Sequence, residues 1–270
     1  MDFLYLSLVF ALGGLSALVY YKLAPTKKYL KERLPNRISW AGFISWLIII
    51  VIIWFIFNNY SGFTRTTYIF TLFFALLLFE TFFLIIIKYI KSNLLASLTT
   101  FVLIGSIFSL YLYEPTFVFR NIIIILASLG AVTLLIRLGY LKVWIIFALA
   151  IIWTGYDIWA TQYFFPNVLV PVTEASRVFF FPAAIVGQVS LGSGDFIFLS
   201  LFTIIILHRF GVLPAIILIT AQTTALIITA LLITSNDFII PFLAVMTPIF
   251  FLIYLISYIS LNKPRVENHA

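Results

Sequence analysis

Uncharged apolar segments recur along this chain about every 25 to 30 residues, and each is long enough to cross a bilayer, which takes about 20 residues. Of the 270 residues, 64% are hydrophobic and only 9% are charged, whereas a soluble domain has roughly a quarter charged residues. The pattern excludes a soluble globular protein. It predicts an integral, multi-pass membrane protein surrounded by the lipid bilayer.

We predict an all-α polytopic fold with nine transmembrane helices, each an uncharged run bounded by charge, proline or asparagine. The predicted helices cover residues 3–21, 40–57, 68–87, 94–113, 121–136, 143–163, 189–207, 214–233 and 241–260. They form a single membrane domain, residues 1–270, with helices one to five in 1–140 and helices six to nine in 141–270. The first apolar run follows Asp2 and no basic residue, which is the reverse of the charge order in a cleaved signal peptide, so we expect a retained span.

The basic residues predict the orientation. Of the 16 Lys and Arg residues, 13 fall on one predicted side of the membrane, and the other side has only Arg65, Arg120 and Arg177. Because short cytoplasmic loops retain positive charge, we expect an external N-terminus and a cytoplasmic C-terminus, with the plasma membrane as the location. The net charge of +7 is spread between apolar spans and not along one face, so no nucleic-acid partner is expected.

Cysteine is absent from the sequence, which excludes disulfides, thiolate metal sites and a cysteine nucleophile. The two histidines, His208 at a predicted helix end and His269 in the tail, do not make a metal site. We therefore expect neither a metal nor a cofactor.

Three of the nine acidic residues, Glu80, Asp157 and Asp195, lie inside predicted spans, where a charge costs about 2.5 to 3.5 kcal/mol. If helix 143–163 runs outward, Asp157 lies about 9 Å below the external surface. If helix 189–207 runs inward, Asp195 also lies about 9 Å below it. We therefore expect the two aspartates to meet at one depth, and we expect Glu80 to be a protonated residue bonded to a neighbouring helix.

Two facing carboxyl groups in a low-dielectric site cannot both ionise, so the pair is expected to share one proton. Such a pair can take a proton from an attacking water and give one to a peptide carbonyl, as in an aspartic protease. A shared depth is also compatible with two alternatives: a structural aspartate pair, and the proton relay of a proton-coupled transporter.

The residues around the aspartates add a resemblance to a known family. Gly155-Tyr156-Asp157 and Gly192-Ser193-Gly194-Asp195 resemble the Tyr-Asp and Gly-x-Gly-Asp motifs of the signal peptide peptidase and presenilin family of intramembrane aspartyl proteases. The intervening VLVPVTEAS, VFFFP and VSLGSGD are similar to signal peptide peptidase. Pro241-Phe242-Leu243, followed by Pro248, is similar to the family's Pro-Ala-Leu motif and its following proline. The resemblance covers roughly residues 150–255.

The resemblance implies an intramembrane aspartyl endopeptidase with Asp157 and Asp195 as the catalytic dyad. Its substrates would be single-span transmembrane or signal-peptide segments, and the charge distribution favours substrates with a cytoplasmic N-terminus. The residues expected to support the site are Tyr156, Gly192, Gly194, Pro241, Phe242 and Leu243. Glycines beside an aspartate let a helix or a substrate backbone come close, and a proline frees backbone hydrogen-bonding groups.

Three positions depart from the family pattern: Ser193 replaces an apolar residue that is often Leu, Phe242 replaces Ala, and Ile240 stands where Gln is common. These departures bear on substrate preference and on the fit of the site, because both aspartates are present. An inactive relative that binds single-span helices is a third alternative. An active enzyme also needs water at the dyad, so we expect a polar cavity that opens to an aqueous side.

Overall fold

A computed structural model describes residues 2–23, 63–90, 92–113, 116–137, 143–159, 183–186, 189–236 and 241–261. Within these ranges the chain forms eight helices and a pair of short strands, β1 (Ala183–Val186) and β2 (Val189–Gly192). The helices are α1 (Asp2–Leu23), α4 (Phe63–Tyr89), α5 (Asn93–Tyr113), α6 (Phe117–Arg137), α7 (Val143–Trp159), α9 (Ser193–Phe210), α10 (Val212–Asn236) and α11 (Phe242–Leu261). The helix predicted over 40–57 and the predicted helical residues 160–163 lie outside the described residues.

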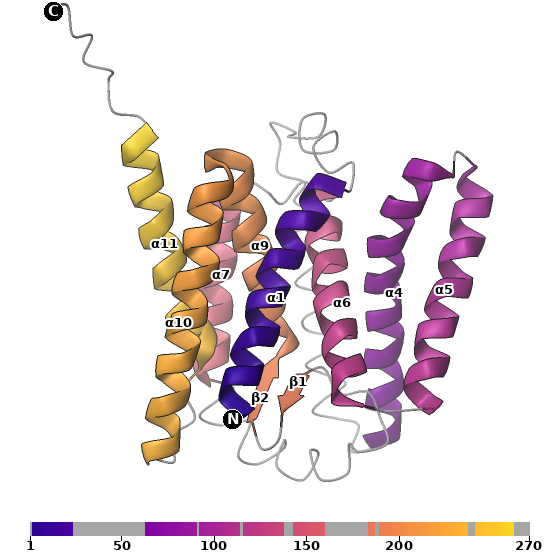
Figure 1. Ribbon diagram of the computed structural model, residues 1–270, viewed down its shortest axis with the longest axis horizontal. Coiled ribbons are helices and arrows are strands. Elements are labelled where there is room, and N and C mark those ends of the chain that lie inside the picture. The colour runs from indigo at the N-terminus through magenta and orange to yellow at the C-terminus, as the bar shows by residue number, and fades with distance from the viewer. Residues whose placement is uncertain are drawn as a thin grey trace, which may run out of the picture.

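Seven of the described helices are long and apolar enough to cross a membrane, and α7 is a shorter apolar helix of 17 residues. The prediction of a helical, multi-pass membrane protein is therefore confirmed in its main point. The helices lie side by side in one bundle, with α4 and α5 on one flank and α10 and α11 on the other (Figure 1). The hairpin of β1 and β2 lies at one end of this bundle, between α1 and α6.

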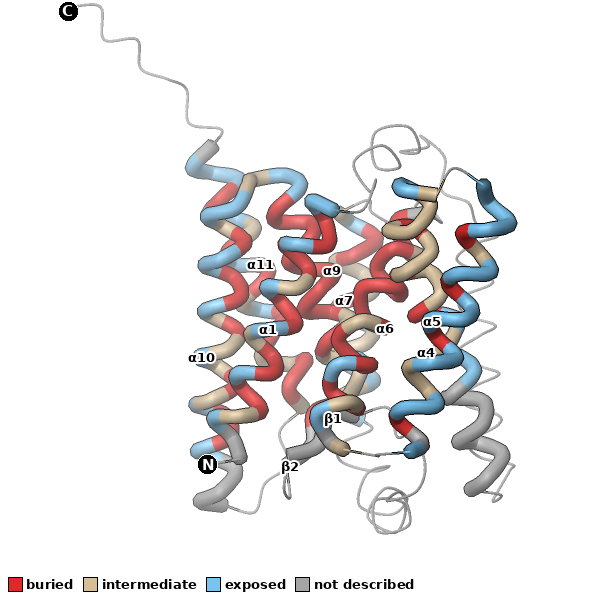
Figure 2. The backbone as a smooth tube through the Cα atoms, turned by 45° about the vertical axis from the view of Figure 1, so that its right-hand side comes forward, coloured by how far each residue is buried: buried red, intermediate tan, exposed pale blue. Residues whose placement is uncertain are grey.

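Helix α9 is the centre of the bundle, because it packs against α1, α6, α10 and α11. Phe196 and all residues from Phe198 to Leu207 are buried, so α9 has no polar face. The helices around it bury one side and expose large apolar residues on the other (Figure 2). This is the pattern expected of helices that face lipid tails, which are as apolar as leucine.

Two glycines let α1 pack closely on the C-terminal helices. A Cβ on Gly13 would lie 3.1 Å from the ring of Phe196 in α9, and one on Gly14 would lie 2.8 Å from the side chain of Ile219 in α10. Small residues of this kind allow membrane helices to approach each other. The first helix in the sequence is therefore part of the packing that supports the last four.

One predicted helix begins with a strand instead. Residues 189–192 form β2, which pairs antiparallel with β1 so that Ala183 is opposite Gly192 and Val186 is opposite Val189. The hydrophobic pattern of a short apolar run is the same in a buried strand and in a buried helix. The strand partner, β1, is a separate segment that the local pattern of residues 189–192 does not reveal. Gly192 has extended backbone angles, φ −64° and ψ 149°, and α9 begins directly after it.

The start of the fifth predicted helix is also wrong. Helix α6 begins at Phe117, so Arg120, which the sequence places in an external loop, is a buried helical residue. Its Nη2 donates a hydrogen bond of 3.2 Å to the hydroxyl of Tyr111 in α5. Because Arg120 has this partner, it can lie within the helix, and α6 begins one turn before the predicted start at residue 121.

Candidate active site

Both aspartates lie close to a helix end. Asp157 is two residues before the last described residue of α7, and Asp195 is two residues after the first residue of α9. The predicted depth of Asp195 was counted from a helix start at residue 189, so that count is wrong. The start of α9 and the end of α7 nevertheless lie toward the same end of the bundle as the hairpin (Figure 1).

The chain leading into α9 holds Asp195 in place. The backbone N–H of Gly192, the N-cap residue, donates a hydrogen bond of 3.1 Å to Oδ2 of Asp195 at the third helical position. This is the half of a capping box in which a carboxylate reaches back to the cap; Gly192 has no side chain to form the other half. The Asp195 side chain therefore sits at the junction between β2 and α9, where it is partly exposed.

The start of α11 holds Asp157. The backbone N–H of Leu243 donates a hydrogen bond of 3.0 Å to Oδ2 of Asp157. The first N–H groups of a helix have no partner within it, so a carboxylate is a favourable acceptor there. One turn further along both helices, the hydroxyls of Thr154 and Thr247 form a second hydrogen bond of 2.9 Å. Helices α7 and α11 are thus joined twice beside Asp157.

Asp195 interacts electrostatically with Asp157. A ring contact between Trp153 of α7 and Phe198 of α9, with centroids 6.3 Å apart, also joins the helices that carry them. Two carboxylates in this relationship lower their repulsion by sharing one proton. The arrangement can therefore supply a proton acceptor and a proton donor at one place.

Helix α11 begins well inside the bundle. Gln222 of α10 donates from Nε2 to the carbonyl oxygen of Met246, at 3.2 Å, which sets the two helices level at that point. From there α10 continues for about 21 Å to Asn236, whereas α11 extends only about 6 Å back to Phe242. The segment Pro241-Phe242-Leu243 consequently lies about 15 Å short of the end of α10, at the level of Asp157.

The three residues of this segment have different surroundings. Leu243 contacts Asp157 through its backbone, while the carbonyl of Pro241 accepts a hydrogen bond of 3.1 Å from the N–H of Ala244. The Phe242 ring is buried and packs edge-on against Phe10 of α1, with centroids 5.4 Å apart. Phe10 also contacts Phe196, the neighbour of Asp195, at 5.7 Å. Phe242, through Phe10, therefore joins the start of α11 to α1 and, through Phe196, to α9.

The space beside Asp195 is open on the side of Gly194. Among the described residues, a Cβ at Gly194 would meet nothing within 4 Å, and one at Gly192 would meet Oδ2 of Asp195 at 3.5 Å and the backbone nitrogen of Gly194 at 4.0 Å. Of the two predicted uses of these glycines, close packing of another helix is not seen among the described residues. Room for a substrate backbone stays a prediction, and the open space agrees with it.

Tyr156 is next to Asp157 in the sequence and interacts with it electrostatically, whereas Glu80 lies on another helix. The Tyr156 ring is half exposed and contacts the rings of Trp153 and Trp159 on its own helix. Glu80 lies on α4, whose main neighbours are α5 and α6, and it interacts electrostatically with Tyr20 of α1. Sequence reasoning missed Thr154, Thr247 and Gln222, although a polar residue within an apolar span is a signal for such contacts.

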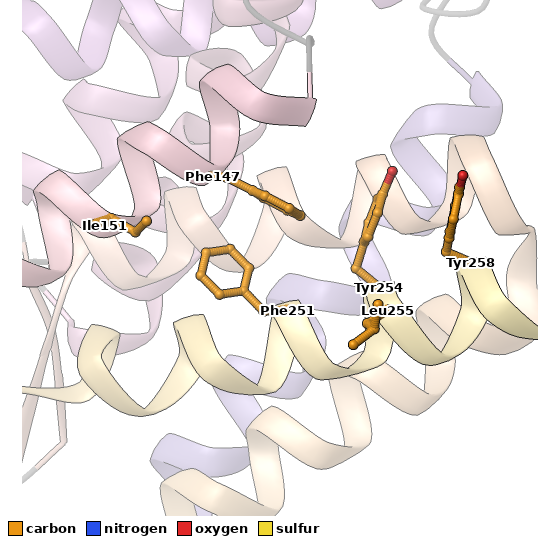
Figure 3. Close-up of a pocket in the computed structure, with 6 residues that line it drawn as sticks. All are labelled: Phe147, Ile151, Phe251, Tyr254, Leu255 and Tyr258. Atoms are coloured by element: carbon orange, nitrogen blue, oxygen red, sulfur yellow. The ribbon is translucent and has the colours of Figure 1, made fainter.

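A pocket of about 390 Å³ lies between α7 and α11, but not at the aspartates. Its lining is apolar and aromatic and comes from Phe147, Ile151, Phe251, Tyr254, Leu255 and Tyr258 (Figure 3). Ile151 is six residues before Asp157, a distance of about 9 Å along α7. This pocket is not the polar cavity expected from the sequence, which stays a prediction.

No protein-family model matches this chain, and no curated protein matches it. The function is therefore inferred from the motifs in the sequence and from the contacts that the aspartates make.

Proposed function

We propose that this chain is an intramembrane aspartyl endopeptidase of the signal peptide peptidase and presenilin type, with Asp157 and Asp195 as its dyad. The observation that carries the proposal is the placement of the two carboxylates: Asp157 accepts a hydrogen bond from the start of α11, and Asp195 accepts one from the junction of β2 and α9. Aspartates are expensive within the membrane, and a pair of them that meets in a bundle of apolar helices is a functional feature by default.

The proposed reaction uses only the two carboxyl groups and water. The ionised carboxylate takes a proton from a water molecule as its oxygen attacks the scissile carbonyl, and the protonated carboxyl gives its proton to the carbonyl oxygen. The tetrahedral diol then collapses and the C–N bond breaks. The leaving nitrogen takes the proton that the first carboxyl group received from water, and one diol hydroxyl returns its proton to the second carboxylate. The products are a carboxylic acid and an amine, and the dyad returns to its singly protonated state.

A substrate helix has to unwind before this attack, because its peptide carbonyls are already hydrogen-bonded. Two features support an extended segment beside Asp195: the open space at Gly194, and the hairpin that ends at Gly192. In the part of the chain that the structure describes, each strand of this sheet is paired along one edge, and an extended peptide can add to the other edge. The VLVPV segment, which the resemblance associates with the substrate, lies outside the described residues.

The finer topology is part of the same proposal. We place nine spans in the plasma membrane, with the N-terminus outside and the C-terminus in the cytoplasm, on the basis of the lysine and arginine distribution. Substrates would be single-span transmembrane or signal-peptide segments whose N-terminus is cytoplasmic. Neither a metal nor a cofactor takes part.

A cleavage assay in liposomes tests the proposal. The substrate is a peptide with one apolar segment of about 20 residues and a fluorophore and quencher at its ends. Wild-type protein is expected to cleave it, and Asp157→Asn and Asp195→Asn are each expected to abolish cleavage. A transition-state isostere that carries a hydroxyl in place of the scissile amide is expected to inhibit the wild type.

The matched control is Glu80→Gln, which neutralises the third intramembrane carboxyl group and is expected to retain cleavage. Cleavage that survives in either aspartate variant would remove the dyad from the mechanism. Proton-coupled solute uptake without peptide cleavage would instead identify a transporter. Binding of the peptide without cleavage by the wild type would identify an inactive relative.

A further inference from the structure

The side chain of Asn121 in α6 is buried without a hydrogen-bond partner among the described residues. It is only 3% exposed, and neither its Nδ2 nor its Oδ1 is bonded. Buried polar groups are nearly always paired, because water no longer compensates an unpaired donor or acceptor. Both ends of this amide are therefore unsatisfied at one place inside the bundle.

The position of Asn121 relative to α9 follows from one interhelical bond. The hydroxyls of Ser128 in α6 and Ser200 in α9 are hydrogen-bonded at 3.0 Å, which identifies the facing sides of the two helices. Asn121 is seven residues before Ser128, about two turns, so it lies on the side of α6 that faces α9. Ser193 has the same relationship to Ser200 in α9.

Both helices start at the hairpin end of the bundle and run in the same direction (Figure 1). Asn121 is therefore level with Ser193 and within about 3 Å of the level of Asp195. Strand β1 packs on α6 at this end, and its partner β2 continues directly into α9. The unpaired amide thus lies beside the strand-to-helix junction that carries Asp195 and that is open at Gly194.

We propose that Asn121 is a positioning residue that holds one peptide group of the unwound substrate beside Asp195. This inference rests on the proposed protease function. A side-chain amide has two N–H donors and a carbonyl acceptor, so it can accept from the N–H and donate to the C=O of an extended chain. A substrate unwound within the membrane has backbone N–H and C=O groups that have lost their helical partners and have no water to bond. Asn121 and the substrate backbone satisfy each other, and Asn121 does not touch the reacting atoms.

The first test measures kcat, KM and thermal stability of Asn121→Leu with the fluorogenic single-span peptide. Leucine has a similar size and no polar atoms, so the variant is expected to be as stable as the wild type or more stable. Its KM is expected to rise about tenfold, which corresponds to the loss of a good hydrogen bond to the bound chain. The matched control is Thr203→Val in α9, which also removes a buried unpaired polar atom but lies eight residues beyond Asp195, and it is expected to leave KM unchanged.

The second test uses peptides in which one backbone amide at a time is replaced by an ester, which removes one N–H donor. With the wild type, the ester at one position near the cleavage site is expected to raise KM several-fold. With Asn121→Leu, the same ester is expected to have no further effect, because the acceptor that the N–H used is gone. Asn121→Gln, with its longer side chain, is expected to move the sensitive position or lose it, which keeps the proposal testable if Asn121→Leu folds poorly.

The outcomes separate the two proposals. Failure of the wild type to cleave overturns the protease function, and the role of Asn121 falls with it. Wild-type cleavage combined with an unchanged KM in Asn121→Leu, or with the same ester sensitivity in both proteins, overturns the positioning role alone. In that case Asn121 is a structural residue, and its stability change is its only effect.

Discussion

Oδ2 of Asp157 accepts a hydrogen bond of 3.0 Å from the backbone N–H of Leu243, so a carboxylate near the end of α7 caps the start of α11. This contact joins two segments that are 86 residues apart in the sequence. It gives Asp157 a structural role in addition to the catalytic one that we propose.

Two substitutions at Asp157 separate these roles. Asp157→Ala removes the acceptor and leaves the Leu243 N–H unpaired, which is expected to lower the free energy of unfolding by about 1 to 3 kcal/mol. Asp157→Asn keeps an acceptor oxygen and is expected to be nearly as stable as the wild type. Unfolding by titration with a denaturing detergent measures both, and cleavage is expected to be lost in both. Equal destabilisation by Asn and Ala would mean that the negative charge at the start of α11, and not the hydrogen bond, provides the stability.

A methyl group at Gly194 tests the open space beside Asp195. Gly194→Ala is expected to leave stability unchanged within about 1 kcal/mol, because a Cβ there meets nothing and alanine is the better helix former. Cleavage is expected to fall, since the methyl group would occupy the space proposed for the substrate backbone. The matched control is Gly105→Ala in α5, where a Cβ also meets nothing and both properties are expected to be retained. Full activity in Gly194→Ala would place the substrate elsewhere.

The contact between α4 and α6 depends on Gly130. A Cβ at this position would overlap the carbonyl oxygen of Leu77 in α4, so the two helices would have to separate. Gly130→Ala is therefore expected to lose about 1 to 3 kcal/mol of stability, the usual effect of overpacking. Gly105→Ala is again the control, and the detergent titration is the measurement. A Gly130→Ala variant as stable as this control would show that α4 shifts freely against α6.

The absence of cysteine makes a direct test of the orientation possible. Ser92→Cys and Tyr113→Cys each introduce one thiol at an exposed residue, on opposite ends of α5. With intact cells and a membrane-impermeant maleimide, Tyr113→Cys is expected to react from outside, and Ser92→Cys only after permeabilisation. The reverse labelling pattern would invert the proposed topology and with it the expected direction of the substrates.

The membrane class and the approximate positions of eight helices could be predicted, because long apolar runs leave few alternatives. The boundaries failed where a distant partner decides the local structure. Residues 189–192 form a strand because β1 pairs with them, and Arg120 joins α6 because Tyr111 accepts its hydrogen bond. Neither partner is visible in a local hydrophobic pattern.

In the candidate site, too, the residues could be predicted from the sequence but their contacts could not. The two aspartates and the Pro241-Phe242-Leu243 segment could be identified from residue types and order. The capping of α11 by Asp157 could not, because it depends on which helices are neighbours across the bundle. The role of Phe10 as a contact of both Phe196 and Phe242 was also hidden, since α1 is far from those residues in the sequence.

The close packing of Gly13 and Gly14 against α9 and α10 also affects how the protein is made. Gly13 and Gly14 of α1 are synthesised about 180 to 205 residues before Phe196 and Ile219, which they contact, so α1 enters the bilayer long before α9 and α10 exist. Its glycine surface has to stay unoccupied, or be held by another membrane component, until translation reaches α10. The contacts of α1 with α9 and α10, which support the segment that carries Asp195, consequently form only after both later helices have entered the bilayer.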